Sequence, residues 1–134
     1  MYRIYVAGAL SGTALQYLEN MRRMMCVCVR LWLMKVSPFC PCLDYHYALM
    51  RPELEDRPLL DDFYRASLSW VKVSDAVLVL PNWEGSKGTQ AEIAEAVRLG
   101  IPVFLKPQLL LRHFDLPLDP ALDVLFEKWE SEPV

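Results

Sequence analysis

The chain has 134 residues, of which 54% are hydrophobic and 23% are charged, and its formal net charge is −3. This composition excludes a disordered chain, and the length is typical of a single domain, residues 1–134, that buries a core without disulfides or metals. The small negative charge, without a basic block, argues against nucleic-acid binding by bulk electrostatics, so we expect a small-molecule ligand.

The apolar stretches are too short for export or for membrane insertion. Residues 4–10 are shorter and more strand-like than the apolar core of a signal peptide. Residues 24–36 are interrupted by Arg30 and Lys35 and fall short of the roughly 20 residues that a spanning helix needs. We therefore expect a cytoplasmic protein with no membrane partner.

In chain order, the first elements are a strand over residues 2–7 and a small-residue turn over residues 8–12. Such a turn lets backbone N–H groups approach an anion. Residues 15–34 follow as a long helix, with Arg22, Arg23 and Arg30 off its apolar stripe. Apolar residues cover more than one face of this helix, which predicts a second face buried in a homodimer or higher oligomer.

A second strand ends near residues 36–38, and prolines at positions 41, 52 and 58 then predict an irregular connection over residues 39–58. A connection of this length is often a lid or a binding loop. It holds Asp44, Tyr45, His46 and Tyr47. The aromatic rings among them could stack on a base. A single loop histidine is more often a surface residue than a catalytic one.

The four cysteines form two CxC pairs, Cys26 with Cys28 and Cys40 with Cys42. Neither pair has the usual spacing of metal ligands, and positions i and i+2 of a helix point to different faces. We expect reduced, packed thiols and no metal site.

The segment from residue 74 to residue 105 reads as one strand, loop, helix and strand unit. Residues 76–80 and 103–105 are apolar strands, and residues 89–99 between them have helical spacing. A helix over residues 59–73 precedes this unit. Ligands of parallel sheets bind beyond the carboxyl ends of the strands, which places residues 81–88 at the mouth of a site.

The last part of the chain is predicted to be irregular over residues 107–120 and helical over residues 121–129. The helix would share one apolar face among Leu122, Leu125, Phe126 and Trp129. Together these elements predict an α/β fold, a three-layer sandwich around a flavodoxin-like parallel sheet of four or five strands.

Glu92 has two interpretations from its position alone. Thr89, Gln90, Ala91 and Glu92 fit a capping box, in which the Glu92 side chain accepts from the Thr89 backbone N–H. Alternatively, free N–H groups and the helix dipole favour an ionised carboxylate there, as a nucleophile that attacks a sugar carbon requires.

Two stretches carry a resemblance to a known family: IYVAGALSG at residues 4–12 and SDAVLVLPNWEGSKGTQAEIAEAVRLGIPV at residues 74–103. They resemble the nucleoside 2-deoxyribosyltransferase superfamily, and most closely its small uncharacterised bacterial and phage branch with an LPGWExSxGAxxE pattern. The resemblance spans roughly residues 2–105 and is weak between residues 13 and 68.

The resemblance implies roles for particular residues. Glu92, at the end of the GxxxE pattern that begins at Gly88, would be the nucleophile. Ser86 stands where the transferases acting on nucleosides have Asp and the deoxynucleoside 5'-monophosphate N-glycosidases have a phosphate-contacting Ser. The family uses the first loop against the sugar and phosphate, and Tyr5 matches a Tyr near the sugar; the corresponding loop residues here are Gly8, Ser11 and Gly12.

One position departs from the family pattern. Counting back eight residues from Asp75 gives Ser67, where the family usually has an Asp that holds the sugar and assists the leaving base. A serine cannot act as a general acid at neutral pH, so we expect slow or absent turnover unless Asp44, Asp61 or Asp62 fills the gap.

The sequence therefore predicts hydrolysis, or transfer, at the N-glycosidic bond of a (deoxy)nucleoside 5'-monophosphate through a glycosyl-Glu92 intermediate. It implies no cofactor and no metal. The alternatives are a non-catalytic nucleotide-binding or regulatory module, which Ser67 motivates, and a flavodoxin-like partner-binding protein in which Glu92 is only a cap.

Overall fold

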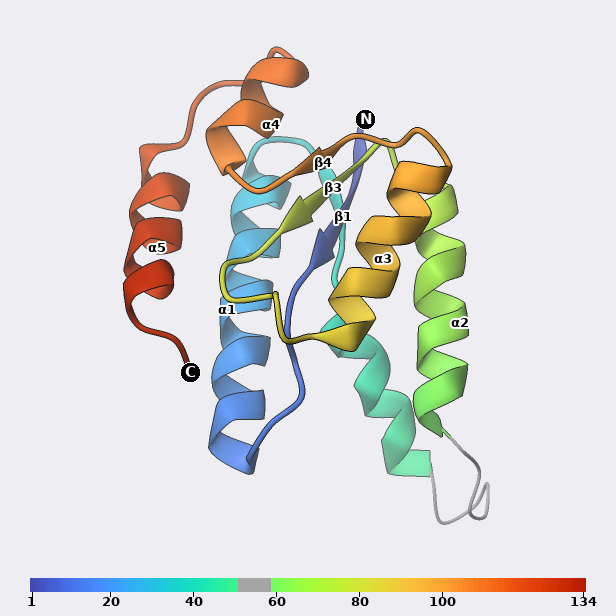
Figure 1. Cartoon of the computed structure of the whole chain (residues 1–134). Helices are drawn as coiled ribbons and strands as arrows, with labels where there is room; N and C mark the ends of the chain where they lie inside the picture. Colours follow the sequence, from blue (N-terminus) through green and yellow to red (C-terminus); the bar gives the residue numbers. More distant parts are fainter. Residues whose placement is uncertain (51–58) are drawn as a thin grey trace.

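A computed structural model describes residues 1–50 and 59–134 and has a parallel sheet at its centre (Figure 1). Within these residues the sheet has four strands, β1 (Arg3–Ala7), β2 (Ser37–Phe39), β3 (Ala76–Val79) and β4 (Val103–Phe104). Their order is β2-β1-β3-β4 and all three pairings are parallel. This order is flavodoxin-like, as the sequence predicted.

Helices cover both faces of the sheet. On one face lie α1 (Ala14–Leu33), α4 (Pro107–His113) and α5 (Pro120–Ser131), and on the other lie α2 (Leu59–Lys72) and α3 (Lys87–Arg98). The three-layer sandwich is therefore confirmed. A 3₁₀ helix, η1 (Pro41–Met50), leads out of β2.

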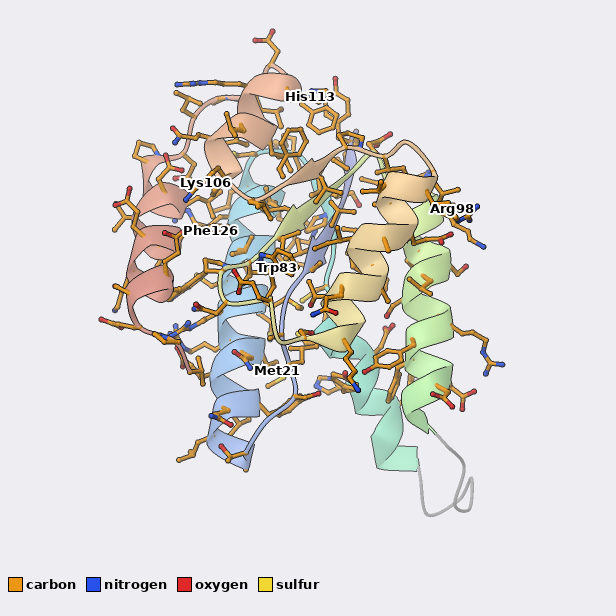
Figure 2. The ribbon with its side chains drawn as sticks, viewed as in Figure 1. Met21, Trp83, Arg98, Lys106, His113 and Phe126 are labelled. Carbon is orange, nitrogen blue, oxygen red and sulfur yellow. The ribbon has the colours of Figure 1, made fainter. Side chains whose placement is uncertain are left out.

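The alternation of side chains along β1 divides the core in two. Ile4 and Val6 are buried with residues of α1, α4 and α5, whereas Tyr5 and Ala7 are buried with residues of α2 and α3. Because both faces of β1 and β3 are covered, residues 4–7 and 76–79 are continuous apolar runs, whereas β2 and β4 at the edges of the sheet are half-buried. Side chains fill the space between the layers, with Phe126 pointing inward from α5 (Figure 2).

The α1 helix begins with a capping box in which Thr13 and Gln16 exchange hydrogen bonds. Its buried residues include Met24, Val27 and Leu31. Arg23 is also buried, so its predicted place off the apolar stripe is wrong. Its spacing of four residues from Val27 puts it on the buried face.

Two predicted irregular segments contain helices. Residues 107–113 form α4 because Pro107 sits at its start, where a missing N–H costs nothing, and Leu110 and Leu111 are buried. The predicted loop over residues 39–58 begins with η1, which Pro41 opens in the same way. Pro52 and Pro58 lie outside the described residues. Among the residues described, no helix has the length and apolar character to cross a membrane.

Candidate functional site

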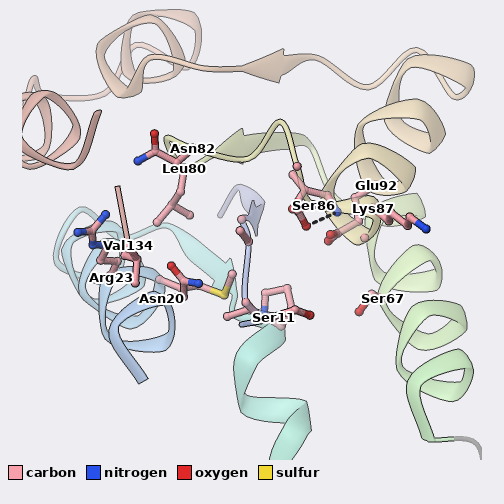
Figure 3. Close-up of a pocket in the computed structure, with 18 of the residues that line it drawn as sticks. Ser11, Asn20, Arg23, Ser67, Leu80, Asn82, Ser86, Lys87, Glu92 and Val134 are labelled. Atoms are coloured by element: carbon pink, nitrogen blue, oxygen red, sulfur yellow. Dashed lines mark hydrogen bonds between the residues drawn. The ribbon is translucent and has the colours of Figure 1, made fainter. Parts of the chain in front are cut away.

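A pocket of about 550 Å³ opens at the carboxyl ends of β1 and β3 (Figure 3). The loops after these two strands form its floor and rim, and α1, α2 and α3 supply its walls. This is the position at which parallel sheets bind ligands. Figure 3 shows Ser67 and Glu92 on one side of the pocket and Arg23 and Asn82 on the other.

The loop after β3 is fixed at both ends. Asn82 has a positive φ of 64° and donates from Nδ2 to the Trp129 carbonyl at 2.6 Å, which ties the loop to α5. Ser86 ends the loop as the N-cap of α3, because its Oγ accepts from the Thr89 backbone N–H at 3.3 Å and from the Thr89 hydroxyl at 3.0 Å. The start of α3 therefore faces the pocket.

The capping interpretation of Glu92 is wrong. The helix begins at Lys87 rather than at Thr89, so Glu92 lies in its second turn and Ser86 caps the helix. The Glu92 side chain is buried, with 9% of the residue exposed. Its Oε2 has no hydrogen-bond partner among the described residues. A buried acceptor left in this way is uncommon in folded proteins and requires an explanation.

Burial also changes the proton affinity of this carboxyl. Loss of hydration raises the pKa of Glu92 to about 7, against an opposing effect of the Tyr5 hydroxyl. Burial, and then the Glu92 charge, raise the pKa of Tyr5 well above its ordinary value. Near neutral pH the Glu92 carboxyl is therefore close to half ionised.

Tyr5 reaches the site from beneath, in the middle of the sheet. It is fully buried, and its hydroxyl lies close enough to Glu92 and Ser67 to affect its pKa. The Tyr5 hydroxyl is not hydrogen-bonded to Glu92 or to Ser67. The Tyr5 hydroxyl and the Glu92 Oε2 are therefore both buried polar atoms without a partner in the described chain. A hydrogen bond needs alignment as well as proximity.

Two glycines allow the walls of the pocket to approach. A Cβ on Gly8 would lie 3.2 Å from the Leu80 side chain, and a Cβ on Gly88 would lie 3.2 Å from the Tyr64 ring. Gly8 therefore lets the two strand-end loops meet, and Gly88 lets α3 pack against α2. Both residues line the pocket, as do Ser11, Ser67, Ser86 and Glu92.

Other predicted site residues lie elsewhere. Gly12 does not line the pocket. It precedes Thr13, the N-cap of α1. Asp44 is half-buried in η1, where burial raises its pKa, but it also stays outside the lining. Asp61 is exposed and Asp62 pairs with Arg65. Among the described residues, Glu92 is the one carboxylate side chain that lines the pocket.

The sequence did not point to the basic side of the pocket. Arg23 lines it from α1, donates from Nη2 to the Glu132 carbonyl at 2.9 Å, and lies 5.5 Å from the centre of the Trp129 ring. Lys87 adds a second cation at the start of α3. The four-residue spacing of Arg23 from Val27 was the signal that could have placed this arginine on the buried face.

Aromatic side chains form part of the wall formed by η1 and α2. Tyr45, Phe63 and Tyr64 line the pocket, and the rings of Tyr45 and Phe63 meet edge to face at 4.8 Å. Flat apolar rings of this kind suit a planar ligand. His46 and Tyr47, which the sequence placed in the same connection, are exposed.

Part of the chain matches the model of a known protein family. The model of a domain of unknown function, DUF4406, matches residues 45–105, a segment that includes Ser67, Ser86 and Glu92. Neither the curated proteins nor the solved structures contain a match to this chain. Within the described residues, no group of three or more His, Cys, Asp or Glu side chains could hold a metal ion.

Proposed function

We propose that the pocket binds a (deoxy)nucleoside 5'-monophosphate and that Glu92 cleaves its N-glycosidic bond, by hydrolysis or less readily by transfer. The observation that carries this proposal is the Glu92 carboxyl, buried at the carboxyl ends of the strands with an unpartnered Oε2 and a pKa of about 7. The resemblance of residues 4–12 and 74–103 to the nucleoside 2-deoxyribosyltransferase superfamily gives it independent support.

In the proposed reaction the ionised Glu92 attacks the anomeric carbon of the sugar. The bond from that carbon to the base breaks, and the base leaves with the electron pair and then takes up a proton. Water then attacks the anomeric carbon of the glycosyl-Glu92 ester, which releases the sugar phosphate and the free carboxylate. Two displacements at one carbon retain its configuration.

The start of α3 is suited to the phosphate. The Ser86 hydroxyl accepts two hydrogen bonds from Thr89, so its own proton is free to donate to a phosphate oxygen. The N-terminus of a helix favours an anion through its N–H groups and its dipole. Lys87 and the loop that holds Gly8 and Ser11 complete this side.

The base would lie against the aromatic wall. Tyr45, Phe63 and Tyr64 offer apolar faces and edges to a planar ring, with Tyr64 held close to Gly88. This arrangement would place the sugar between the wall and the start of α3, within reach of Glu92.

A second candidate is a non-catalytic nucleotide-binding or regulatory module. Its support is that Glu92 is the one carboxylate side chain lining the pocket among the described residues, while Ser67 is a hydroxyl beside Tyr5. A serine does not supply a proton to a departing base at neutral pH. Both candidates predict that a nucleotide binds, but only the enzyme predicts release of the base.

Incubation with a panel of nucleoside 5'-monophosphates, in ribose and deoxyribose forms, distinguishes them. Release of free base by the wild type and none by Glu92→Gln supports the enzyme. Binding by calorimetry without release supports the module. Equal affinity for a nucleoside and its 5'-monophosphate would count against the phosphate pocket and favour the nucleoside transferases.

We further propose that the protein self-associates through α1 in the cytoplasm, where its nucleotide ligand would be found. The outer face of α1 carries exposed Met25, Val29 and Trp32, the last with 65% of its surface exposed. These residues follow one another at intervals of four and three, so they form one apolar stripe. A second copy of the helix would cover it.

A further inference from the structure

Two cysteine thiols meet where β2 leads into η1, and a third lies near them on α1. Cys28 arrives from α1, Cys40 follows the last residue of β2, and Cys42 lies in the first turn of η1. The Sγ atoms of Cys40 and Cys42 are 3.3 Å apart. Cys28 and Cys42 are buried, whereas Cys40 is partly exposed. The cluster combines an accessible thiol with a buried one in contact with it.

The surroundings of Cys40 favour its thiolate. Interaction with the neighbouring Cys28 side chain, and then with the Cys42 side chain, lowers the pKa of Cys40. The same contacts, together with burial, raise the pKa of Cys28 and of Cys42. The close contact of Cys40 with its more buried neighbours therefore favours a thiolate on Cys40 over one on Cys28 or Cys42. Thiolates, not thiols, are the nucleophiles in cysteine chemistry.

We propose that Cys40 and Cys42 form a reversible oxidation site that reacts with hydrogen peroxide. The Cys40 thiolate attacks one peroxide oxygen, the O–O bond breaks, and the departing hydroxide takes up a proton to become water. Cys40 is then a sulfenic acid. The Cys42 sulfur attacks the Cys40 sulfur, the S–O bond breaks, and the hydroxide that leaves takes the Cys42 proton as a second water. Two thiols have become a disulfide, and peroxide has been reduced to two waters.

The partner of Cys40 in this disulfide is Cys42 rather than Cys28. Cys42 is two residues away and its Sγ lies 3.3 Å from the Cys40 Sγ, whereas Cys28 lies on α1, a separate element. The residue between the two, Pro41, lines the pocket, so the new bond would form next to the pocket wall. A dithiol reductant reverses the reaction by thiol–disulfide exchange.

The test uses the wild-type protein treated with peroxide, quenched, unfolded and labelled with a maleimide. The number of free thiols should fall by two from the four of the sequence and should return after reduction. Cleavage after Arg23, Arg30 and Lys35 separates Cys28 from the peptide that holds Cys40 and Cys42. The proposed bond therefore appears as that single peptide lacking two hydrogen atoms.

Variants give independent readouts. In Cys42→Ser the reaction should stop at the sulfenic acid, which dimedone captures on Cys40. Cys26→Ser is the matched control, because Cys26 lies on the same helix as Cys28 but is not among the groups that lower the pKa of Cys40, and this variant should still lose two thiols. Failure of peroxide to remove thiols, at concentrations that oxidise free glutathione, would overturn the proposal. A disulfide joining the Cys28 peptide to the peptide that holds Cys40 and Cys42 would also overturn the proposal, as would loss of the reaction in Cys26→Ser.

Discussion

Replacing Glu92 by glutamine should make the protein more stable above pH 7 while it ends any base release. The wild-type carboxylate loses hydration on folding and gains no hydrogen-bond partner for Oε2 among the described residues, so its ionised form is disfavoured in the folded state. Glutamine keeps the size of the side chain and carries no charge. The substitution therefore removes the cost of burying the charge and little else.

The size and pH range of this effect follow from the pKa. Burial raises the pKa of Glu92 from 4.5 to about 7. Each pKa unit corresponds to about 1.4 kcal/mol, so the full effect is about 3 kcal/mol. Between these two pH values the folded protein holds more protons than the unfolded one, and its stability falls as the pH rises. The advantage of Glu92→Gln should be absent below pH 4.5, grow through this range and level off above pH 7.

Urea unfolding of both proteins at several pH values measures the difference. Glu95→Gln is the matched control, since Glu95 lies on the same helix but pairs with Arg98, which points to solvent (Figure 2). The hydrogen bond from Arg98 lowers the pKa of Glu95. Glu95→Gln should therefore reduce the stability of the protein at pH values above the ordinary pKa of a glutamate. A Glu92→Gln protein that is less stable than the wild type at pH 8 would refute the reasoning.

Four further outcomes are expected. Base release by the wild type should rise with pH through about 7, because the attacking Glu92 must be ionised, and an initial-rate profile that is flat from pH 5 to 9 would contradict this. Ser86→Ala should lower the free energy of unfolding by roughly 0.5–2 kcal/mol through loss of the helix cap, and calorimetry should show a reduced preference for the 5'-monophosphate over the nucleoside. Ser67→Asp should raise base release by up to about 10²–10⁴-fold if a proton donor is what the site lacks; an unchanged rate would show that another group already serves. Trp32→Glu should turn an oligomer into a monomer in light scattering, and a wild type that is already monomeric at micromolar concentration would remove the α1 interface.

The centre of the sheet was predictable because β1 after Arg3, and all of β3, are buried on both faces. A run such as Ile4, Tyr5 and Val6 has no polar residue to face water, and only a covered parallel strand explains it. The α4 helix lies in the segment predicted to be irregular, and Pro107 stands at its start. Proline stops a helix when it falls inside one, but it fits at the first position, and the local pattern does not distinguish the two cases.

The candidate site was predictable in part. The sequence placed the loop after β3 and Glu92 at the mouth, yet it began the helix at Thr89, two residues late. Ser86 and Thr89 are both good caps, and the choice between them depends on where the chain leaves β3. Arg23 and Trp129 meet in the pocket wall across a long stretch of chain, and no local spacing reports such a contact.

The position of Glu92 is difficult to account for by folding alone. Thr89 and Ala96, one turn before and one turn after it, are fully buried on the same face of α3, so the helix presents a packed surface there. A neutral side chain of similar size would fill that surface without the cost of a buried charge. The Tyr5 hydroxyl is buried beside it and also lacks a partner among the described residues. Two adjacent polar groups that leave their hydrogen bonds unmade, at the edge where parallel sheets bind ligands, are better explained by a ligand that completes them than by the stability of the fold.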